Sequence, residues 1–204
     1  MWIIIHWKEQ ERVISLGYAA DFCPVCRQIR TFEISEIRMA THLWFIPVER
    51  GTFLRHQQAC VHCRVMQNSH RGRFARFERS PRKPLEDLIA ETNPNLRASK
   101  AERLAVEEKI AAGGEGIDAG TRTQLLLEPF AIAEPHFDSG FGQEGRRILA
   151  LALRPLQPTE DEIRACLTRY RSGFNRMGKM LRTADVMNSI YPERQQRAPG
   201  SFDY

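Results

Sequence analysis

The residues best suited to chemistry in this chain are four cysteines in two C-x-x-C pairs, Cys23 with Cys26 and Cys60 with Cys63. A C-x-x-C turn aims two sulfurs at one point, and two such turns form the tetrahedral thiolate cage that zinc accepts at about 2.3 Å per bond. Four protein ligands leave no position for water or substrate, so the pattern predicts one structural Zn²⁺. Four unrelated buried thiols, disulfides and an iron site are the weaker alternatives.

Basic residues and histidines surround both cysteine pairs. Arg27 and Arg64 stand where such turns commonly carry glycine, and their charge offsets the net negative charge of a zinc tetrathiolate. His62 lies inside the second pair, between His56 and His70, and one of these histidines is an alternative ligand. With four cysteines present, we expect the histidines to face solvent or to support the ligands instead.

The two pairs are 33 residues apart, so other elements must bring them together. Segments 30–38, 41–48 and 52–59 have the composition of strands, and a three-stranded antiparallel sheet would close the gap. Short runs of β-branched and aromatic residues mark this third of the chain: Trp2–Trp7, Val13–Leu16, Phe32–Ile34, Leu43–Val48 and Thr52–Leu54.

Residues 1–66 resemble a family of small bacterial and fungal zinc-ribbon proteins. The resemblance is carried by these residues: Ile3-Ile4-Ile5, Leu16-Gly17, Cys23-Pro24-Val25-Cys26, Leu43-Trp44-Phe45-Ile46-Pro47-Val48, and Cys60 with Cys63. It implies a four-cysteine zinc site on a small β-sheet and implies little about activity. No family is identified for residues 84–204.

After residue 83 the apolar spacing becomes helical. Pro84 can open one helix, and Ser99 with Glu102 forms a possible capping box for a second, ended by glycines 113, 114 and 116. Helical segments follow near Thr121 and over residues 143–153. The clearest helix starts at a second capping box, Thr159 with Glu162, and carries its apolar face on to Leu181.

Composition and charge restrict the class of protein. With 204 residues and 42% hydrophobic residues the chain can build a core, which argues against wholesale disorder. Its longest stretch without charge is ten residues, Met39–Val48, against the ~20 that span a bilayer. The start of the chain lacks the pattern of a signal peptide, so we expect a reducing, cytoplasmic setting in which the cysteines bind metal.

Charge is unevenly distributed along the chain: the net charge is +7 over residues 1–83, −6 over 84–140 and +4 over 141–204. Segment 64–83 is the most basic, with two phenylalanines among its arginines. It predicts either nucleic-acid binding or a basic connector whose phenylalanines pack into a core and whose arginines face the acidic middle third. The nucleic-acid interpretation rests on Arg64, Arg71, Arg73, Phe74, Arg76, Phe77 and Arg79.

No motif outside the cysteine pairs predicts catalysis. Cys166 falls on the apolar face of the last long helix, where a buried, inert thiol is expected. Residues 136–139 contain histidine, aspartate and serine, but adjacency in sequence does not produce the geometry of a catalytic triad.

These observations predict an α+β chain: an N-terminal antiparallel β zinc ribbon (1–66), a basic connector (67–83), a helical domain (84–191) and a tail (192–204). The predicted function is a non-catalytic accessory or adaptor protein that presents Trp44, Phe45 or their neighbours to a protein partner. The alternative is nucleic-acid or ribosome binding through segment 64–83 and the basic last helix.

Overall fold

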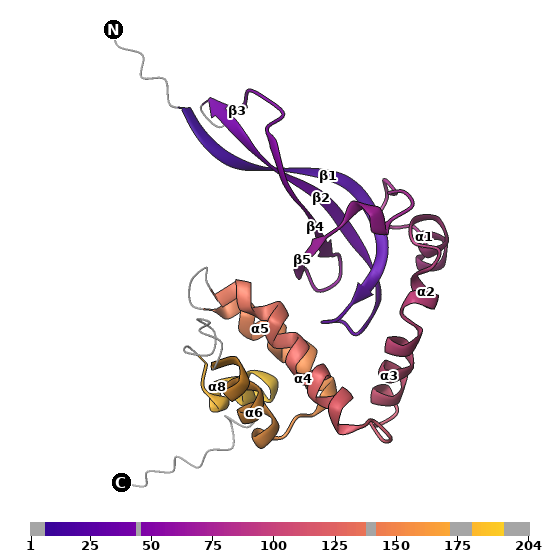
Figure 1. Cartoon of the computed structure of the whole chain (residues 1–204), viewed down its shortest axis with the longest axis vertical. Helices are drawn as coiled ribbons and strands as arrows, with labels where there is room; N and C mark the ends of the chain where they lie inside the picture. Colours follow the sequence, from indigo (N-terminus) through magenta and orange to yellow (C-terminus); the bar gives the residue numbers. More distant parts are fainter. Residues whose placement is uncertain (1–6, 44–45, 138–141, 172–180, 194–204) are drawn as a thin grey trace. The chain divides into compact units, whose positions relative to one another are not determined.

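The structure is a computed structural model that describes residues 7–43, 46–137, 142–171 and 181–193. An antiparallel β-sheet is followed by several helices, which confirms the predicted α+β class (Figure 1). The chain divides into two compact units, residues 1–23 with 28–101 and residues 24–27 with 102–204. The predicted domain boundaries at residues 66, 83 and 191 stay a prediction. No helix of the described residues has the length and apolar character needed to cross a bilayer.

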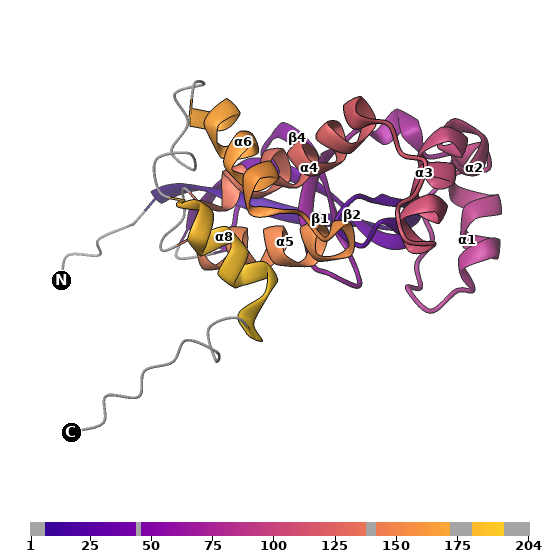
Figure 2. The ribbon, with the colours of Figure 1, turned by 90° about the horizontal axis from the view of Figure 1, so that it is seen from below.

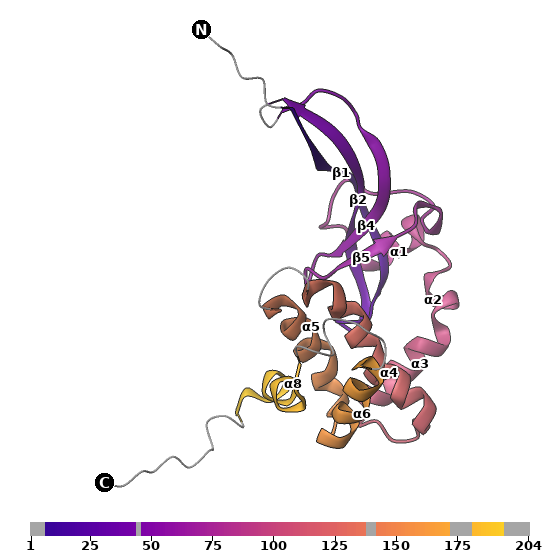
Figure 3. The ribbon, with the colours of Figure 1, turned by 60° about the vertical axis from the view of Figure 1, so that its left-hand side comes forward.

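The first unit is built on a five-stranded sheet with the order β1-β2-β4-β5, and β3 also pairs with β2. Its strands are β1 (Trp7–Cys23), β2 (Gln28–Leu43), β3 (Ile46–Pro47), β4 (Thr52–Cys60) and β5 (Met66–Ser69). All pairs are antiparallel. The β1–β2 hairpin is long and curved (Figure 3), and its 17-residue first strand spans roughly 55 Å at about 3.3 Å per residue.

The predicted strands fall on this sheet, but the strands are longer than the sequence pattern indicates. The predicted segment 30–38 and residues 41–43 of the predicted segment 41–48 lie in the single strand β2, while residues 46–47 form β3. The predicted segment 52–59 lies in β4. Residues 2–6, Trp44 and Phe45 lie outside the described residues. A bulge between Ser15 and Gly17 bends β1. Gly17 has a φ of +128°, and a Cβ there would stand 2.5 Å from the carbonyl oxygen of Glu78, so only glycine fits.

Two short helices cover part of the sheet in the first unit: α1 (Leu85–Thr92) and α2 (Leu96–Ser99) both contact β1. The Thr92 hydroxyl accepts a hydrogen bond from the Ala20 amide at 3.0 Å and donates one to the Leu88 carbonyl at 2.7 Å. Leu88 and Leu96 are fully buried. Ser99 ends α2 and its hydroxyl donates to the Leu96 carbonyl, so the predicted capping role of Ser99 is replaced by a bond within its own helix.

The second unit contains the turn 24–27 and a group of helices. These are α3 (Ala101–Ala111), α4 (Ala119–Ala133), η2 (Glu134–Phe137), α5 (Gln143–Leu153), η3 (Arg154–Leu156), α6 (Glu160–Arg171) and α8 (Thr183–Ile190). Helices α4, α5, α6 and α8 pack on one another (Figure 2). Their core is made of large, fully buried side chains: Phe130, Ile148, Leu149, Leu153, Ile163 and Leu167.

Local capping explains where the helices start. The Asp118 carboxylate accepts from the Thr121 amide at 2.9 Å and so caps α4. The predicted capping box before α6 is confirmed: the Thr159 amide donates to Glu162 at 2.8 Å, and the Glu162 amide donates to the Thr159 hydroxyl at 3.2 Å. The predicted continuation of this helix to Leu181 passes through residues 172–180, which lie outside the described part of the chain.

A chain of alternating charges runs through the second unit. Arg27 Nε donates to Glu107 at 2.7 Å, Glu107 also accepts from Arg103 at 2.7 Å, and Arg103 donates to Glu128 at 2.6 Å. The side chains of Arg27 and Glu107 are only 6% and 9% exposed. Burial lowers the pKa of Arg27, and the Glu107 carboxylate opposes that shift. The pair is therefore a buried ion pair.

Candidate metal centre

The four predicted cysteine ligands sit at the ends of strands and in the turns that follow them. Cys23 is the last residue of β1 and Cys26 lies in the turn to β2, while Cys60 ends β4 and Cys63 lies in the turn to β5. Two backbone hydrogen bonds close the second turn: the Arg64 amide donates to Cys60 at 2.8 Å, and the Cys60 amide donates to Val65 at 3.0 Å. The β-hairpins therefore set the positions of the ligands.

The structure brings all four sulfurs together. The Sγ atoms lie within 4.8 Å of one another, and those of Cys23 and Cys63 are 3.6 Å apart. A tetrahedron with metal–sulfur bonds of about 2.3 Å has edges of about 3.8 Å, whereas a disulfide needs about 2.05 Å. Cys23, Cys60 and Cys63 are buried and Cys26 is half-buried. This cluster can hold one metal ion, and four thiolates would fill its coordination sphere.

The residue after each cysteine pair adopts a left-handed backbone conformation. The φ angles of Arg27 and Arg64 are +59° and +62°. Left-handed conformations cost a residue with a Cβ about 1–2 kcal/mol, and glycine avoids this cost. The two turns thus have the backbone geometry that glycine usually provides, but arginine occupies that position in each turn.

We expect Arg64→Gly to raise the free energy of unfolding of the metal-loaded protein by about 0.5–1 kcal/mol. The gain is smaller than the relieved strain because glycine also loses more conformational entropy on folding. The Arg64 side chain is exposed, so little packing is lost. Arg64→Ala is the control: it removes the same charge but keeps a Cβ, so it should not stabilise. Urea titrations of both variants measure the difference.

The histidines near the second pair do not join the cluster. Among the described residues the four sulfurs form the group suited to a metal, and it contains no histidine. His62 and His70 are exposed and His56 is half-buried.

Several predicted nucleic-acid residues of the basic segment 64–83 pack against other parts of the first unit, to which this segment belongs. Phe74 is only 8% exposed, and its ring lies 5.8 Å from that of half-buried Phe77. Arg76 pairs with Glu91 of α1, which lies in the acidic third of the chain. Phe74 is therefore not placed to stack on a base.

Arg73 contacts a buried carboxylate that the sequence analysis missed. Asp21 is 1% exposed and accepts hydrogen bonds from the Phe22 amide at 2.8 Å, from Gln58 at 3.0 Å and from Arg73 at 3.0 Å. Asp21 lies two residues before Cys23, so this network links the first cysteine pair to β4 and to the basic segment. No sequence motif predicts this hydrogen-bond network, because the partners of Asp21 are far apart in the sequence.

Arg64, Arg71 and Arg79 differ from Arg73 and Arg76. All three are exposed, and none forms an ion pair with a residue that the structure describes. They offer positive charge to solvent.

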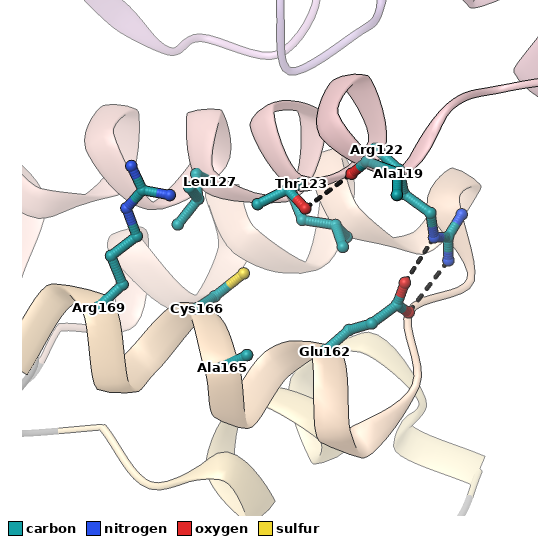
Figure 4. A pocket seen from close by; sticks show the side chains of 9 residues that line it. Ala119, Arg122, Thr123, Leu127, Glu162, Ala165, Cys166 and Arg169 are labelled. Carbon is teal, nitrogen blue, oxygen red and sulfur yellow. Dashed lines mark hydrogen bonds and ion pairs between the residues drawn. The ribbon is translucent and has the colours of Figure 1, made fainter.

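Cys166 lies on α6 in the second unit and does not belong to the group of four cysteines. It is buried on α6 and lines a hollow between α4 and α6 (Figure 4). Burial raises the pKa of its thiol to about 11, with a further increase from Glu162. Of the residues 136–139 considered in the sequence analysis, Asp138 and Ser139 lie outside the described residues.

We expect alkylation of Cys166 to become steadily faster as the pH rises through 9 and 10 and to reach half of its maximum rate only near pH 11. The reason is that the thiolate is the nucleophile, and the folded protein keeps this thiol protonated. Peptide mapping after timed treatment with iodoacetamide measures the rate. A rate profile with its midpoint near pH 8.5, as for an exposed cysteine, would contradict the buried environment.

No family model matches the chain, and no match is found among curated proteins or among solved structures. The resemblance of residues 1–66 to the small zinc-ribbon proteins therefore stays a prediction, and the geometry of the four sulfurs carries the functional argument.

Proposed function

We propose that the four cysteines hold one structural Zn²⁺ ion. Two features support zinc: the ligands are all soft thiolates, and the sulfur spacing suits a tetrahedron. When bound, the ion cross-links the turn after β1 to the turn after β4. Cysteines kept as thiolates for a metal fit a reducing compartment such as the cytoplasm. Metal analysis of the purified protein tests the identity, since an iron site would instead colour the protein.

We further propose that the protein is a non-catalytic adaptor that contacts a protein partner through the end of the sheet opposite the metal centre. The observation that carries this proposal is a group of exposed apolar side chains there. The strand register pairs Cys23 with Gln28 at one end of the β1–β2 hairpin and Trp7 with Leu43 at the other. Ile46, which pairs with Leu43, is 69% exposed, and Val48 is 50% exposed.

Three more apolar side chains of the same sheet are exposed: Val13 of β1, and Phe53 and Leu54 of β4. Isolated exposed apolar residues are ordinary, but several on one small sheet are typical of a contact surface. The predicted contact residues Trp44 and Phe45 immediately precede Ile46 in the sequence. A sheet held together by a metal at one end would present its opposite end, which carries Ile46 and Val48, as a rigid surface.

The experiment is affinity capture from nuclease-treated cell extract with the metal-loaded protein. We expect a specific protein partner that is lost with the double variant Ile46→Lys, Val48→Lys, because lysines in the apolar contact would bury unpaired charge. Leu151→Lys on α5 is the control, since Leu151 is an apolar residue on a helix of the second unit and its exposure of 45% is close to that of Val48. Equal capture by wild type and the double variant would overturn the proposed contact surface.

The second candidate function is nucleic-acid or ribosome binding. It is favoured by one observation, the exposure of Arg64, Arg71 and Arg79 without ion pairs to described residues. On this proposal single-stranded RNA would bind with an affinity that falls steeply with salt, and Arg71→Glu with Arg79→Glu would abolish binding. Arg76→Glu is a poor probe because Arg76 pairs with Glu91. The adaptor is favoured if a protein partner is still captured after nuclease treatment and if its binding does not weaken as the salt concentration rises.

A further inference from the structure

Strand β1 lies at the border of the sheet and pairs with β2 along one side. On its other side, the strand pairing among the described residues is a single bridge between Tyr18 and Glu78, whose amides donate to each other's carbonyls at 2.7 and 2.8 Å. Residues 8–15 of that side, here called the outer edge, have no strand beside them in the described part of the chain. A sheet edge of this kind can accept a further strand.

The backbone groups that point outward follow from the alternation of the strand. Successive residues of an antiparallel strand turn their amide and carbonyl to opposite sides. Tyr18 turns both groups outward, and the bulge between Ser15 and Gly17 inserts one residue into the alternation. Before the bulge, the outward groups therefore belong to exposed residues with odd numbers: Glu9, Glu11, Val13 and Ser15.

Charge on the outer edge follows the same alternation. The charged residues with outward backbone groups are acidic, Glu9 and Glu11, whereas those between and beside them are basic, Lys8 and Arg12. Glu11 already pairs with Arg55 of β4, at 3.0 and 3.1 Å. Lys8 and Glu9 are exposed, and neither forms an ion pair with a residue that the structure describes.

This charge pattern disfavours a second copy of the chain as the added strand. In an antiparallel pair, a residue whose backbone groups point toward the partner lies opposite another such residue. Wherever two charged residues of two outer edges met, a glutamate would therefore face a glutamate, or a basic residue a basic one. Like charges directly opposite each other destabilise a strand pair, whereas opposite charges stabilise it.

We propose that the outer edge of β1 binds an extended segment of the protein partner as an antiparallel strand. That segment carries basic residues opposite Glu9 and Glu11 and acidic residues opposite Lys8 and Arg12. Backbone hydrogen bonds hold such a strand, and its side chains select it. The inference rests on the proposed adaptor function, and β1 begins at the end of the sheet that carries Ile46.

The first test titrates the metal-loaded full chain with two short peptides that have blocked ends. The matched peptide, Thr-Val-Thr-Glu-Lys-Thr-Lys-Glu, places lysines opposite Glu9 and Glu11 and glutamates opposite Lys8 and Arg12. The exchanged peptide has each Glu replaced by Lys and each Lys by Glu, so its composition and net charge are the same. We expect the matched peptide to bind about tenfold or more tightly, with a difference that shrinks as salt rises. Equal affinities, or no binding of either peptide, would overturn the proposal.

Hydrogen exchange locates the bound peptide on the sheet. At a concentration that occupies most chains, the matched peptide should slow exchange of the outward amides of Glu9, Glu11 and Val13 about tenfold. The amides of Gln10 and Arg12 face β2 and serve as the control, because their exchange should not change. Strong protection of the outward amides without peptide would show that another segment or a second copy already covers the edge, and would overturn the proposal.

An exchange of charges in the protein tests the selection directly. Lys8→Glu with Glu9→Lys keeps the net charge and should bring the affinities of the two peptides together, because two of the four charge pairs become unfavourable for the matched peptide. The matched control is Glu160→Arg with Arg164→Glu, which exchanges an exposed ion pair on α6. The control should keep the tenfold preference, and an equal loss in both double variants would contradict a site on β1.

The added strand and the adaptor function can fail separately. Partner capture that depends on Ile46 and Val48, combined with equal binding of the two peptides, would overturn the added strand and leave the adaptor in place. A tenfold preference for the matched peptide without any captured partner would support the added strand and count against the adaptor.

Discussion

Cys60→Ser should abolish metal binding and unfold the sheet of the first unit around the metal centre. Three sulfurs and a hydroxyl make a far poorer zinc site than four thiolates, because zinc binds thiolate sulfur strongly. Structural zinc contributes apparent binding free energies of about 10–16 kcal/mol, as much as the whole stability of a typical domain. The β-hairpins would lose the link between their turns. Metal content per chain and far-ultraviolet circular dichroism measure the two effects.

The chain supplies its own control for this experiment. Cys166→Ser replaces the one cysteine that lies outside the group of four sulfurs, so it should keep the metal and the fold of the sheet. Adding a chelator to the wild-type protein should reproduce the effect of Cys60→Ser. A metal-free protein with an intact sheet would show that the strands fold without the ion, and would remove the structural role proposed for zinc.

Glu107→Gln should destabilise the second unit by about 3–5 kcal/mol, the usual cost of removing one partner of a buried ion pair. Arg27 would be left with a buried charge and with one weak partner, the Ala152 carbonyl at 3.5 Å. Its Nη2 atom already has no hydrogen-bond partner among the described residues, so few interactions would remain to compensate the charge of the Arg27 guanidinium. Arg103 loses less, because it keeps Glu128. Denaturation in urea, followed by circular dichroism, gives the change in stability.

An exposed ion pair in the same unit is the comparison for Glu107→Gln. Glu160→Gln breaks the contact of Glu160 with Arg164, whose side chains are both largely exposed, and should change stability by less than about 0.5 kcal/mol. The apolar double variant Arg27→Met, Glu107→Leu should recover most of the loss, because well-packed apolar residues often replace a buried pair at little cost. A loss in Glu107→Gln no larger than in Glu160→Gln would contradict the buried pair.

The sequence predicted the parts of the structure that depend on near neighbours. Helix α5 occupies the predicted segment 143–153, and the capping box between Thr159 and Glu162 forms as expected. A capping box joins residues three apart, so its pattern is visible in any window of the chain. The cysteine pairs are similar, because each C-x-x-C turn is a local signal and only their meeting depends on the fold.

The features that the sequence did not predict depend on distant partners. β1 and β2 extend to 17 and 16 residues because each pairs with the other along its whole length, beyond the short apolar runs. In the sequence Asp21 has no feature that sets it apart from an ordinary polar residue. In the structure its carboxylate accepts hydrogen bonds from Gln58, 37 residues away, and from Arg73, 52 residues away. The hollow beside Cys166 arises from the packing of α4 on α6, which periodicity alone does not fix.

The arginines in the left-handed turns bear on how such metal centres are recognised. A search pattern that demands glycine after each C-x-x-C would pass over this chain, although Arg27 and Arg64 hold the backbone angles that glycine supplies elsewhere. The strain of about 1–2 kcal/mol per turn is small beside the energy of a bound zinc ion. Charged side chains can therefore occupy these turns. At the second turn, where Arg64 is exposed, sequence variation can change the surface of the protein while the ligand geometry is kept.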